Sequence, residues 1–325
     1  MCYSSSVDAS PKQQDHAAEH SGMRPEFRLA TEADLENTYK VYLDANQDLN
    51  RRIGRSVDLE KHTLPTRALA VRRNALRYDA ERFWIAEFGK SIGGFGLAIR
   101  RRSFWYLAAL HVLPEFQGCG VGSELFRRCL GDRRGSDRQI PLLTTSDSAN
   151  LASTGLYLRF GLLPQTSIIQ MQGLPRPLEQ NSVTLRRADS AICQAAFDRL
   201  DQIVLGETRP EDHQCWASVP SIVPYLAYDR DRIVGYIYID RDGALGPAAV
   251  ERPELLAPTI SAAFETYAAD HSTEVQIRIA SSARDCLGAL FSAGFSCVTE
   301  IRLLLTSREF GRFDQYLFSG ADALF

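Results

Sequence analysis

The segment from Leu107 to Leu130, LAALHVLPEFQGCGVGSELFRRCL, constrains the fold more than any other stretch of this chain. Its apolar first part, 107–113, is typical of a buried strand. Pro114 ends that strand because proline offers no N–H to a β-ladder. The alternating glycines of QGCGVG follow, and apolar residues then recur at helical spacing from Val121 onward. We therefore predict a strand, a glycine-rich turn and a helix in succession.

This turn has the properties of an anion site. The first turn of a helix carries free N–H groups and the positive end of the helix dipole. Glycines let a ligand approach the backbone closely, and the usual ligand of such a turn is phosphate. Neither the dinucleotide fingerprint GxGxxG with its acidic partner nor the pattern GxxxxGK[ST] is present. An ordinary tight turn between strand and helix is the alternative.

The spacing LxVxPxxQxxGxG, from Leu110 to Gly122, resembles the acetyl-CoA signature of the GNAT N-acetyltransferase superfamily. That signature is (Q/R)xxGx(G/A) after an LxVxP strand. The resemblance implies that backbone N–H groups of the turn bind the CoA pyrophosphate and that the strand backbone holds the pantetheine arm. The implied cofactor-binding residues are Leu110, His111, Val112, Gln117, Gly118, Cys119, Gly120, Val121, Gly122, Ser123 and Asn150.

A second motif, NxxSxxLYxxxG from Asn150 to Gly161, resembles NxxAxxLYxxxGF of the same superfamily. It departs from that pattern at Ser153 and Leu162. The resemblance implies that Asn150 bonds the CoA arm and that the Tyr157 hydroxyl is catalytic, pointing at the thioester sulfur. A tyrosine with an ordinary pKa near ~10 is protonated at neutral pH and can donate to a thiolate. The alternative for Tyr157 is a core aromatic with a satisfied hydroxyl.

The general base is less clear from the sequence. Many GNAT relatives place a carboxylate four residues before the position of Val112, where this chain has Ala108. His111 is the nearest titratable side chain, but strict strand alternation points it to the opposite face from Ala108. We therefore expect a packed or surface histidine. Glu87, Asp147 or a water molecule are the other candidates.

The other patterns of the first half predict the remaining elements of a GNAT fold, and the resemblance covers 25–173. A Thr31/Asp34 capping pattern opens the first helix. Four arginines on the second helix, between Pro65 and Tyr78, indicate either a solvated face or an entrance for an anionic substrate. The predicted elements are a strand at 27–30, a helix at 32–46, a polar loop at 46–57, a helix at 65–78, a hairpin at 83–87 and 91–99, strands at 104–113 and 140–145, a helix at 148–158 and a strand at 167–171.

The second half of the chain faintly repeats the first. It lacks a glycine pair before its third helix, and alignment on Gly161 and Gly294 places Leu290 where the first half has Tyr157. We therefore predict a degenerate copy that binds no acetyl-CoA and walls one side of the substrate cleft. The fold class is α/β (α+β), with two GNAT-like domains, each a mixed, mostly antiparallel sheet flanked by helices. The predicted divisions are a disordered tail at 1–24, an acetyl-CoA-binding domain at 25–174, a linker at 175–182 and the degenerate domain at 183–325.

Composition narrows the function. The 325 residues are 45% hydrophobic and carry a net charge of −3, which gives no argument for nucleic acid or membrane partners. Seven cysteines without a CxxC pair fit a reducing cytoplasm, and no metal site is expected.

The resemblance implies an N-acetyltransferase that uses acetyl-CoA as co-substrate and transfers acetyl to a small-molecule amine by direct attack in a ternary complex. The alternative is a non-catalytic acyl-CoA-binding or regulatory module. The acceptor's identity stays open, and a monomer and a homodimer are both compatible with the sequence.

Overall fold

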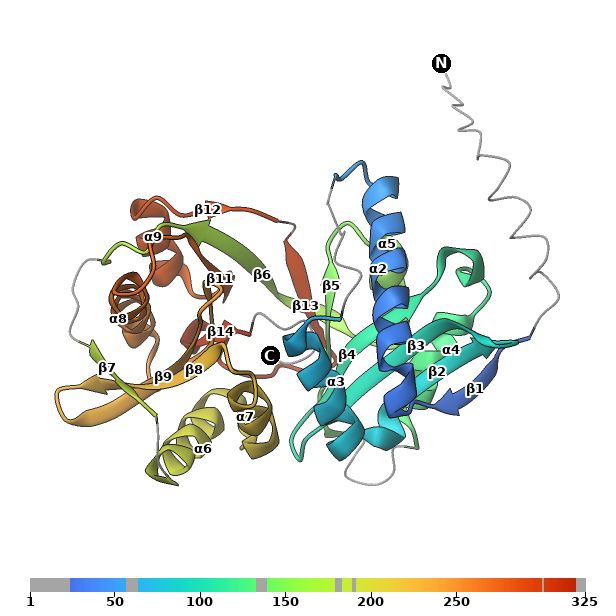
Figure 1. Cartoon of the computed structure of the whole chain (residues 1–325), viewed down its shortest axis with the longest axis horizontal. Coiled ribbons are helices and arrows are strands. Elements are labelled where there is room, and N and C mark those ends of the chain that lie inside the picture. The colour runs from blue at the N-terminus through green and yellow to red at the C-terminus, as the bar shows by residue number, and fades with distance from the viewer. Residues whose placement is uncertain are drawn as a thin grey trace, which may run out of the picture.

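Two halves of the chain lie side by side and share one continuous sheet (Figure 1). The computed structural model describes residues 24–56, 64–132, 139–178, 183–188, 191–299 and 301–319. All but the last residue of the expected tail, and the second half of the expected linker, fall outside these ranges. Within them, no helix is both long and apolar enough to cross a membrane.

The first half contains every element that the sequence predicts. Several boundaries differ: β6 begins at Leu163 instead of 167, α5 begins at Leu151 instead of 148, and α2 runs on to Arg52, into the expected polar loop, instead of ending at Asn46. Asp48 pairs with Arg52 at 2.9 Å, four residues along, and such pairs stabilise a polar helix end. The elements are β1 Glu26–Leu29, η1 Glu32–Asp34, α2 Leu35–Arg52, α3 Thr66–Tyr78, η2 Ala80–Arg82, β2 Phe83–Phe88, β3 Ser91–Arg100, β4 Trp105–Val112, η3 Pro114–Phe116, α4 Val121–Leu130, β5 Leu142–Asp147, α5 Leu151–Arg159 and β6 Leu163–Gly173.

The second half repeats the order of the first, except that three strands follow its last helix where the first half has one. A helix follows Pro253 without a preceding glycine pair, as the sequence predicts. The elements are β7 Val183–Arg187, α6 Ala191–Leu205, α7 Pro210–Ala217, β8 Ile222–Asp229, β9 Arg232–Asp240, β10 Ala244–Val250, η5 Pro253–Leu255, α8 Leu256–Ala268, β11 Val275–Ala280, α9 Arg284–Ser292, β12 Ser296–Cys297, β13 Arg302–Thr306, η6 Phe313–Gln315 and β14 Tyr316–Phe318.

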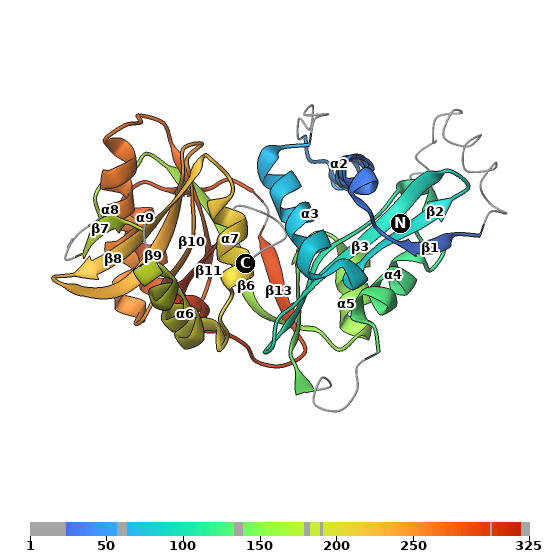
Figure 2. The same ribbon diagram turned by 60° about the horizontal axis from the view of Figure 1, so that its bottom comes forward.

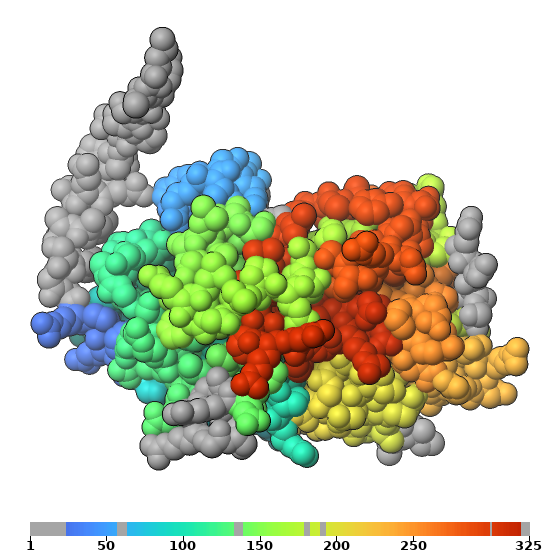
Figure 3. All heavy atoms as spheres, turned by 180° about the vertical axis from the view of Figure 1, so that it is seen from behind, coloured from blue at the N-terminus to red at the C-terminus, as the bar shows by residue number. Residues whose placement is uncertain are grey.

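The halves exchange strands. β13 comes from the second half but lies between β5 and β6, antiparallel to both, with Leu304 opposite Thr145 and Thr166. β6 continues past it and pairs with β11 and β12, where Met171 meets Ile277 and Cys297. Seen from behind, the red C-terminal segment lies against the yellow-green surface of the first half (Figure 3). The strand order is β1-β2-β3-β4-β5-β13-β6-β11-β14-β10-β9-β8-β7.

Helices cover both faces of the first half of the sheet (Figure 2). α2 and α3 pack on one face through a core that includes Leu35, Ala75 and Phe95. α4 and α5 pack on the other face, where Phe126 and Tyr157 lie in one cluster. These two layers leave the middle of the sheet, at β4 and β5, as the place where a ligand can enter between strands.

Buried charge fixes the two halves together. Arg101, in the turn between β3 and β4, is 7% exposed and ion-pairs with Asp79 of its own half and Asp212 of the other. Arg67 of α3 pairs with Asp240 at 3.0 Å. Removing one member of a buried ion pair leaves an uncompensated charge, so such contacts hold a single docked arrangement.

Candidate functional site

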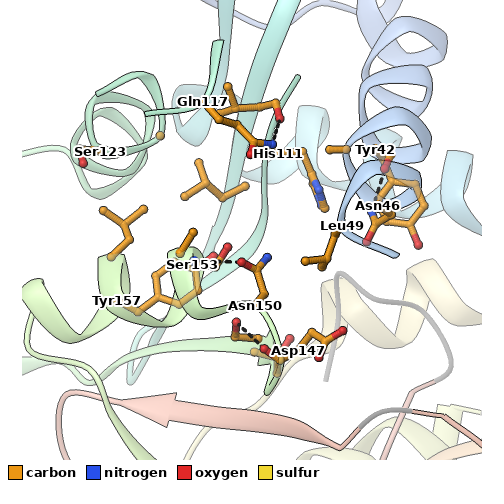
Figure 4. Close-up of a pocket in the computed structure, with 18 of the residues that line it drawn as sticks. Tyr42, Asn46, Leu49, His111, Gln117, Ser123, Asp147, Asn150, Ser153 and Tyr157 are labelled. Atoms are coloured by element: carbon orange, nitrogen blue, oxygen red, sulfur yellow. Dashed lines mark hydrogen bonds between the residues drawn. The ribbon is translucent and has the colours of Figure 1, made fainter. Parts of the chain in front are cut away.

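A cavity of about 460 Å³ opens where β4 and β5 separate. The two strands pair in parallel from Trp105/Leu142 to Leu107/Thr144, and their ladder ends there. The Thr144 hydroxyl donates to the Leu107 carbonyl at 3.0 Å at this last pair. α2, the glycine turn and α5 surround the cavity beyond that point (Figure 4).

The glycine turn forms one end of the cavity. Gly118 and Gly120 have φ values of 78° and 85°, in the left-handed region that glycine adopts without strain. A Cβ built on either would meet nothing within 4 Å, so backbone conformation, not local packing, requires glycine here. The Gln117 side-chain amide donates to the Val112 carbonyl at 2.9 Å and fixes the turn to the end of β4.

Most of the predicted cofactor residues line this cavity, and two do not. Val121 is buried in the core, 4% exposed, and the Cys119 side chain is exposed on the turn. Both can offer only their backbone. The predicted residues that line the cavity are Leu110, His111, Val112, Gln117, Gly118, Gly120, Gly122, Ser123, Asn150 and Tyr157.

α5 brings Asn150 and Tyr157 to the opposite side of the cavity from α2. The Asn150 side-chain oxygen accepts from the Ser153 N–H at 3.1 Å, so it caps the helix. Tyr157 is 4% exposed. Burial raises the pKa of its phenol, while hydrogen bonds with the Thr144 and Ser153 hydroxyls oppose that rise. Tyr157 is therefore protonated at neutral pH and able to donate.

The predicted direction of His111 is wrong, although its ring is packed as expected, against Tyr42 and Phe95. β4 carries a bulge, because Leu97 pairs with Ala109 and Ala98 with Leu107, which leaves Ala108 as an extra residue. The bulge breaks strict alternation and puts Ala108 and His111 on the same face. Ala108 packs into the α2 core, and the His111 ring meets the Tyr42 ring edge-on at 5.1 Å. His111 lines the cavity from the α2 side (Figure 4).

Of the two carboxylates considered as the general base, Asp147 lies at the cavity and Glu87 does not. Asp147 lines the cavity and accepts from the Arg55 guanidinium at 2.8 Å and from the Ala149 N–H at 2.8 Å. Glu87 is not among the lining residues and accepts from Arg28 at 2.7 Å. The arginines of α3 do not form an entrance to the described cavity either, since none of the four lines it.

Sequence reasoning missed the α2 wall and one residue from the far end of the chain. Tyr42, Asn46 and Leu49 of α2 line the cavity, and their i, i+4, i+7 spacing is a helical-face signal that could have identified them. Arg302 of β13 also lines it. No local sequence pattern predicts that Arg302 lines the cavity, because its position depends on the insertion of β13 between β5 and β6.

Comparisons with known proteins agree with this geometry. The Acetyltransferase (GNAT) family profile matches residues 18–162. No curated protein matches the sequence. A proposed acetyltransferase from Pyrococcus horikoshii has the same fold over 93% of this chain and 96% of its own, with a TM-score of 0.69 and 18% identity.

Two further solved structures extend the likeness across both halves. A GCN5-related N-acetyltransferase from Sphaerobacter thermophilus is 16% identical with a TM-score of 0.59, covering 90% of this chain and 98% of its own. A tandem GNAT protein from the clavulanic acid biosynthesis pathway is 13% identical with a TM-score of 0.54, covering 88% of this chain and 99% of its own. Residues 18–162 therefore match the Acetyltransferase (GNAT) family, and the two halves together have the fold of these solved structures, a tandem GNAT protein among them.

Proposed function

We propose that this protein is an acetyl-CoA-dependent N-acetyltransferase that acetylates the amine of a small-molecule acceptor. One observation carries the proposal: β4 and β5 separate beyond Leu107, and the gap opens into a cavity with the glycine turn at one end and Tyr157 in its wall. A gap between paired strands exposes backbone groups that an extended ligand can bond. The match of residues 18–162 to the Acetyltransferase (GNAT) family supports acetyl transfer in general terms.

The residues present fit acetyl-CoA. Backbone N–H groups from Gln117 to Ser123 can bind the pyrophosphate at the start of α4. Each such contact contributes only about 0.3–1 kcal/mol when exposed, so several must act together. The edge of β4 from Leu110 to Val112 lies beyond the last residue pair of the β4–β5 ladder and can bond the amides of the pantetheine arm. The Asn150 side-chain nitrogen, which has no hydrogen-bond partner among the described residues, faces the same cavity (Figure 4).

Acetyl-CoA would supply the acetyl group as a thioester. In the reaction, the neutral amine of the acceptor forms a bond to the carbonyl carbon, the carbon–sulfur bond breaks, and the amine loses a proton. Tyr157 donates its proton to the departing sulfur, a role that its raised pKa preserves at neutral and mildly alkaline pH. His111 takes the amine proton, directly or through one water, from the α2 side.

Two features of the cavity favour direct transfer with His111 as the base. No cysteine is among the described residues that line the cavity, so no thiol is placed to carry the acetyl group. The Asp147 carboxylate is already engaged by the Arg55 guanidinium and the Ala149 N–H. The alternative, a non-catalytic acyl-CoA-binding module, is suggested by the absence of a carboxylate at Ala108. His111 lies on the same face and can act as the base in place of that carboxylate.

The experiment is calorimetry with acetyl-CoA on the whole chain, followed by thiol release with a panel of small amines. We expect one site per chain. The Tyr157→Phe variant should lose about 10²–10⁴-fold in kcat while its acetyl-CoA affinity stays within about twofold. Tyr238→Phe, a buried tyrosine of the second half, is the matched control and should keep full kcat. Binding without turnover in the unmodified protein would favour the binding module, and no binding would remove both readings.

A further inference from the structure

Arg302 is the one residue of the second half among the described residues that line the cavity. β13 carries it there, directly opposite Asp147 on β5 and Ile168 on β6. Its direction follows from strand alternation. Leu303 and Leu305 pack in the cluster that holds Tyr157, whereas Leu304 packs on the other face. Arg302 therefore shares the Leu304 face, where Asp147 meets Arg55.

The charged lining of the cavity is mostly cationic. Its described residues include three guanidinium groups, Arg52, Arg159 and Arg302, and a single carboxylate, Asp147, which Arg55 binds at 2.8 Å. Asp48, which does not line the cavity, pairs with Arg52 at 2.9 Å. A low-dielectric cleft lined by one sign of charge concentrates ligands of the opposite sign. The bound molecules should therefore carry negative charge.

Two of the three arginines belong to the cofactor side. The Arg52 guanidinium donates to the Gln117 side chain at 3.2 Å, at the glycine turn. A side chain added at Gly122, at the start of α4, would contact Leu156 of α5. Arg159 lies on the same helix as Leu156. Arg302 comes instead from the strand beyond β5. Its positive charge acts on the Tyr157 hydroxyl, which places it near the reacting end of the cavity and not at the phosphate end.

We propose that Arg302 is a specificity-determining residue that binds a carboxylate of the acceptor, so that the acceptor is a small aminocarboxylate. This inference rests on the proposed function. A guanidinium presents a planar fork of N–H donors that matches a carboxylate with two parallel hydrogen bonds. A carboxylate held at Arg302 leaves the amine of the same small molecule to reach across the cavity toward His111 and the thioester. The second half then contributes to substrate choice through one side chain.

The experiment uses acceptor pairs that differ in whether a carboxylate or its amide accompanies the amine, such as glycine with glycinamide and β-alanine with β-alaninamide, extended to dicarboxylic amino acids and their amides. Rates are compared at equal concentrations of the neutral amine. In the unmodified protein we expect kcat/KM to favour the acid of at least one pair by about 100-fold. Arg302→Met should abolish that preference, and Arg302→Lys should keep part of it. Acetyl-CoA affinity should stay within about twofold in both variants. Arg308→Met, an exposed arginine just after β13, is the matched control.

A binding measurement keeps the inference testable apart from turnover. N-acetylated products of the same acid and amide pairs are titrated into the CoA-loaded protein, or into the free protein if CoA does not bind. We expect an acid product to bind more tightly than its amide, and Arg302→Met to remove the difference. Acetylation of amides and acids at equal rates would overturn the inference while the proposed function stands. A preference for acids that survives in Arg302→Met would also overturn it, and equal binding of both products would do so even if no amine is acetylated.

Discussion

The same gap between two strands is open in the first half of the molecule and filled in the second. β4 and β5 pair over three residues and then separate around the cavity. β10 and β11 pair at Ala244/Gln276 and Leu245/Ile277 and then separate as well. There β14 enters the gap, with Leu317 opposite Ala248 on one side and Ile279 on the other. The chain's own backbone takes the place that we assign to a cofactor in the first half.

The two halves also differ on the sheet face that α2 covers in the first half and α6 and α7 cover in the second. In the first half, His111 and Tyr42 line a cavity between β4 and α2. In the second half, α6 packs on β9 and β10 and α7 packs on β8, with buried side chains between the helices and the sheet. His213 is 3% exposed there, bonded to Asp201 at 2.9 Å and to Tyr238 at 2.7 Å. Arg209, which is 0% exposed, pairs with the same carboxylate. The side of the sheet that lines a cavity in the first half therefore carries buried, mutually bonded side chains in the second.

The largest expected effect tests the filled gap. Leu317→Ala removes a side chain that is 0% exposed, and truncation of a buried leucine costs about 2–5 kcal/mol because a cavity remains. Urea unfolding should show this loss as a lower midpoint. The control is Leu163→Ala on β6, which is 62% exposed and should change stability by less than about 0.5 kcal/mol. A small loss for Leu317→Ala, or a second acetyl-CoA bound by that variant, would show that β14 does not fill the gap.

The next prediction compares the start of α4 in the first half with the start of α8 in the second. Gly120→Ala forces a side chain into the left-handed region, which costs about 1–2 kcal/mol and moves the N–H groups of the turn. We expect acetyl-CoA to bind about 100-fold more weakly, by calorimetry. Glu254→Gln alters the corresponding start of the helix in the second half and should change neither affinity nor the stoichiometry of one. Equal effects of the two substitutions would contradict the assignment of one site to the first half.

Local patterns predicted much of this molecule, and long-range pairing was the part they could not supply. The glycine turn, the left-handed Gly161 that ends α5 and the turn before β3 follow from neighbouring residues, and the structure has them where expected. Leu303 to Leu305 form a short apolar run that fits any sheet, so nothing local says that it lies between β5 and β6. The His111 error has the same origin in part, because the bulge at Ala108 depends on pairing with β3.

Substitutions of His111 and His213 should distinguish a catalytic histidine from one that only stabilises the fold. His111→Gln removes the base that we propose, and we expect kcat/KM to fall about 30-fold, less than the usual 10²–10⁴ because water can still take the proton. The variant should also lose the acid limb of its pH–rate profile. His213→Gln should leave the rate unchanged but lower stability, since His213 bonds both Asp201 and Tyr238. An unchanged acid limb in His111→Gln would remove His111 from the mechanism.

The smallest effect concerns thiol reactivity. Cys119 lies exposed on the glycine turn, and Cys297 is exposed on β12 of the second half, whereas burial raises the pKa of Cys286 to about 12. Because the thiolate is the reactive form, iodoacetamide should modify the first two and spare Cys286. Saturating acetyl-CoA should slow the reaction at Cys119 about tenfold by covering the turn and leave Cys297 unchanged, as peptide mass spectrometry can measure. Cys119→Ser should bind acetyl-CoA normally, because only its backbone belongs to the turn. Equal protection of both cysteines would point to a second cofactor site in the second half, and no protection of either would move the cofactor away from the glycine turn.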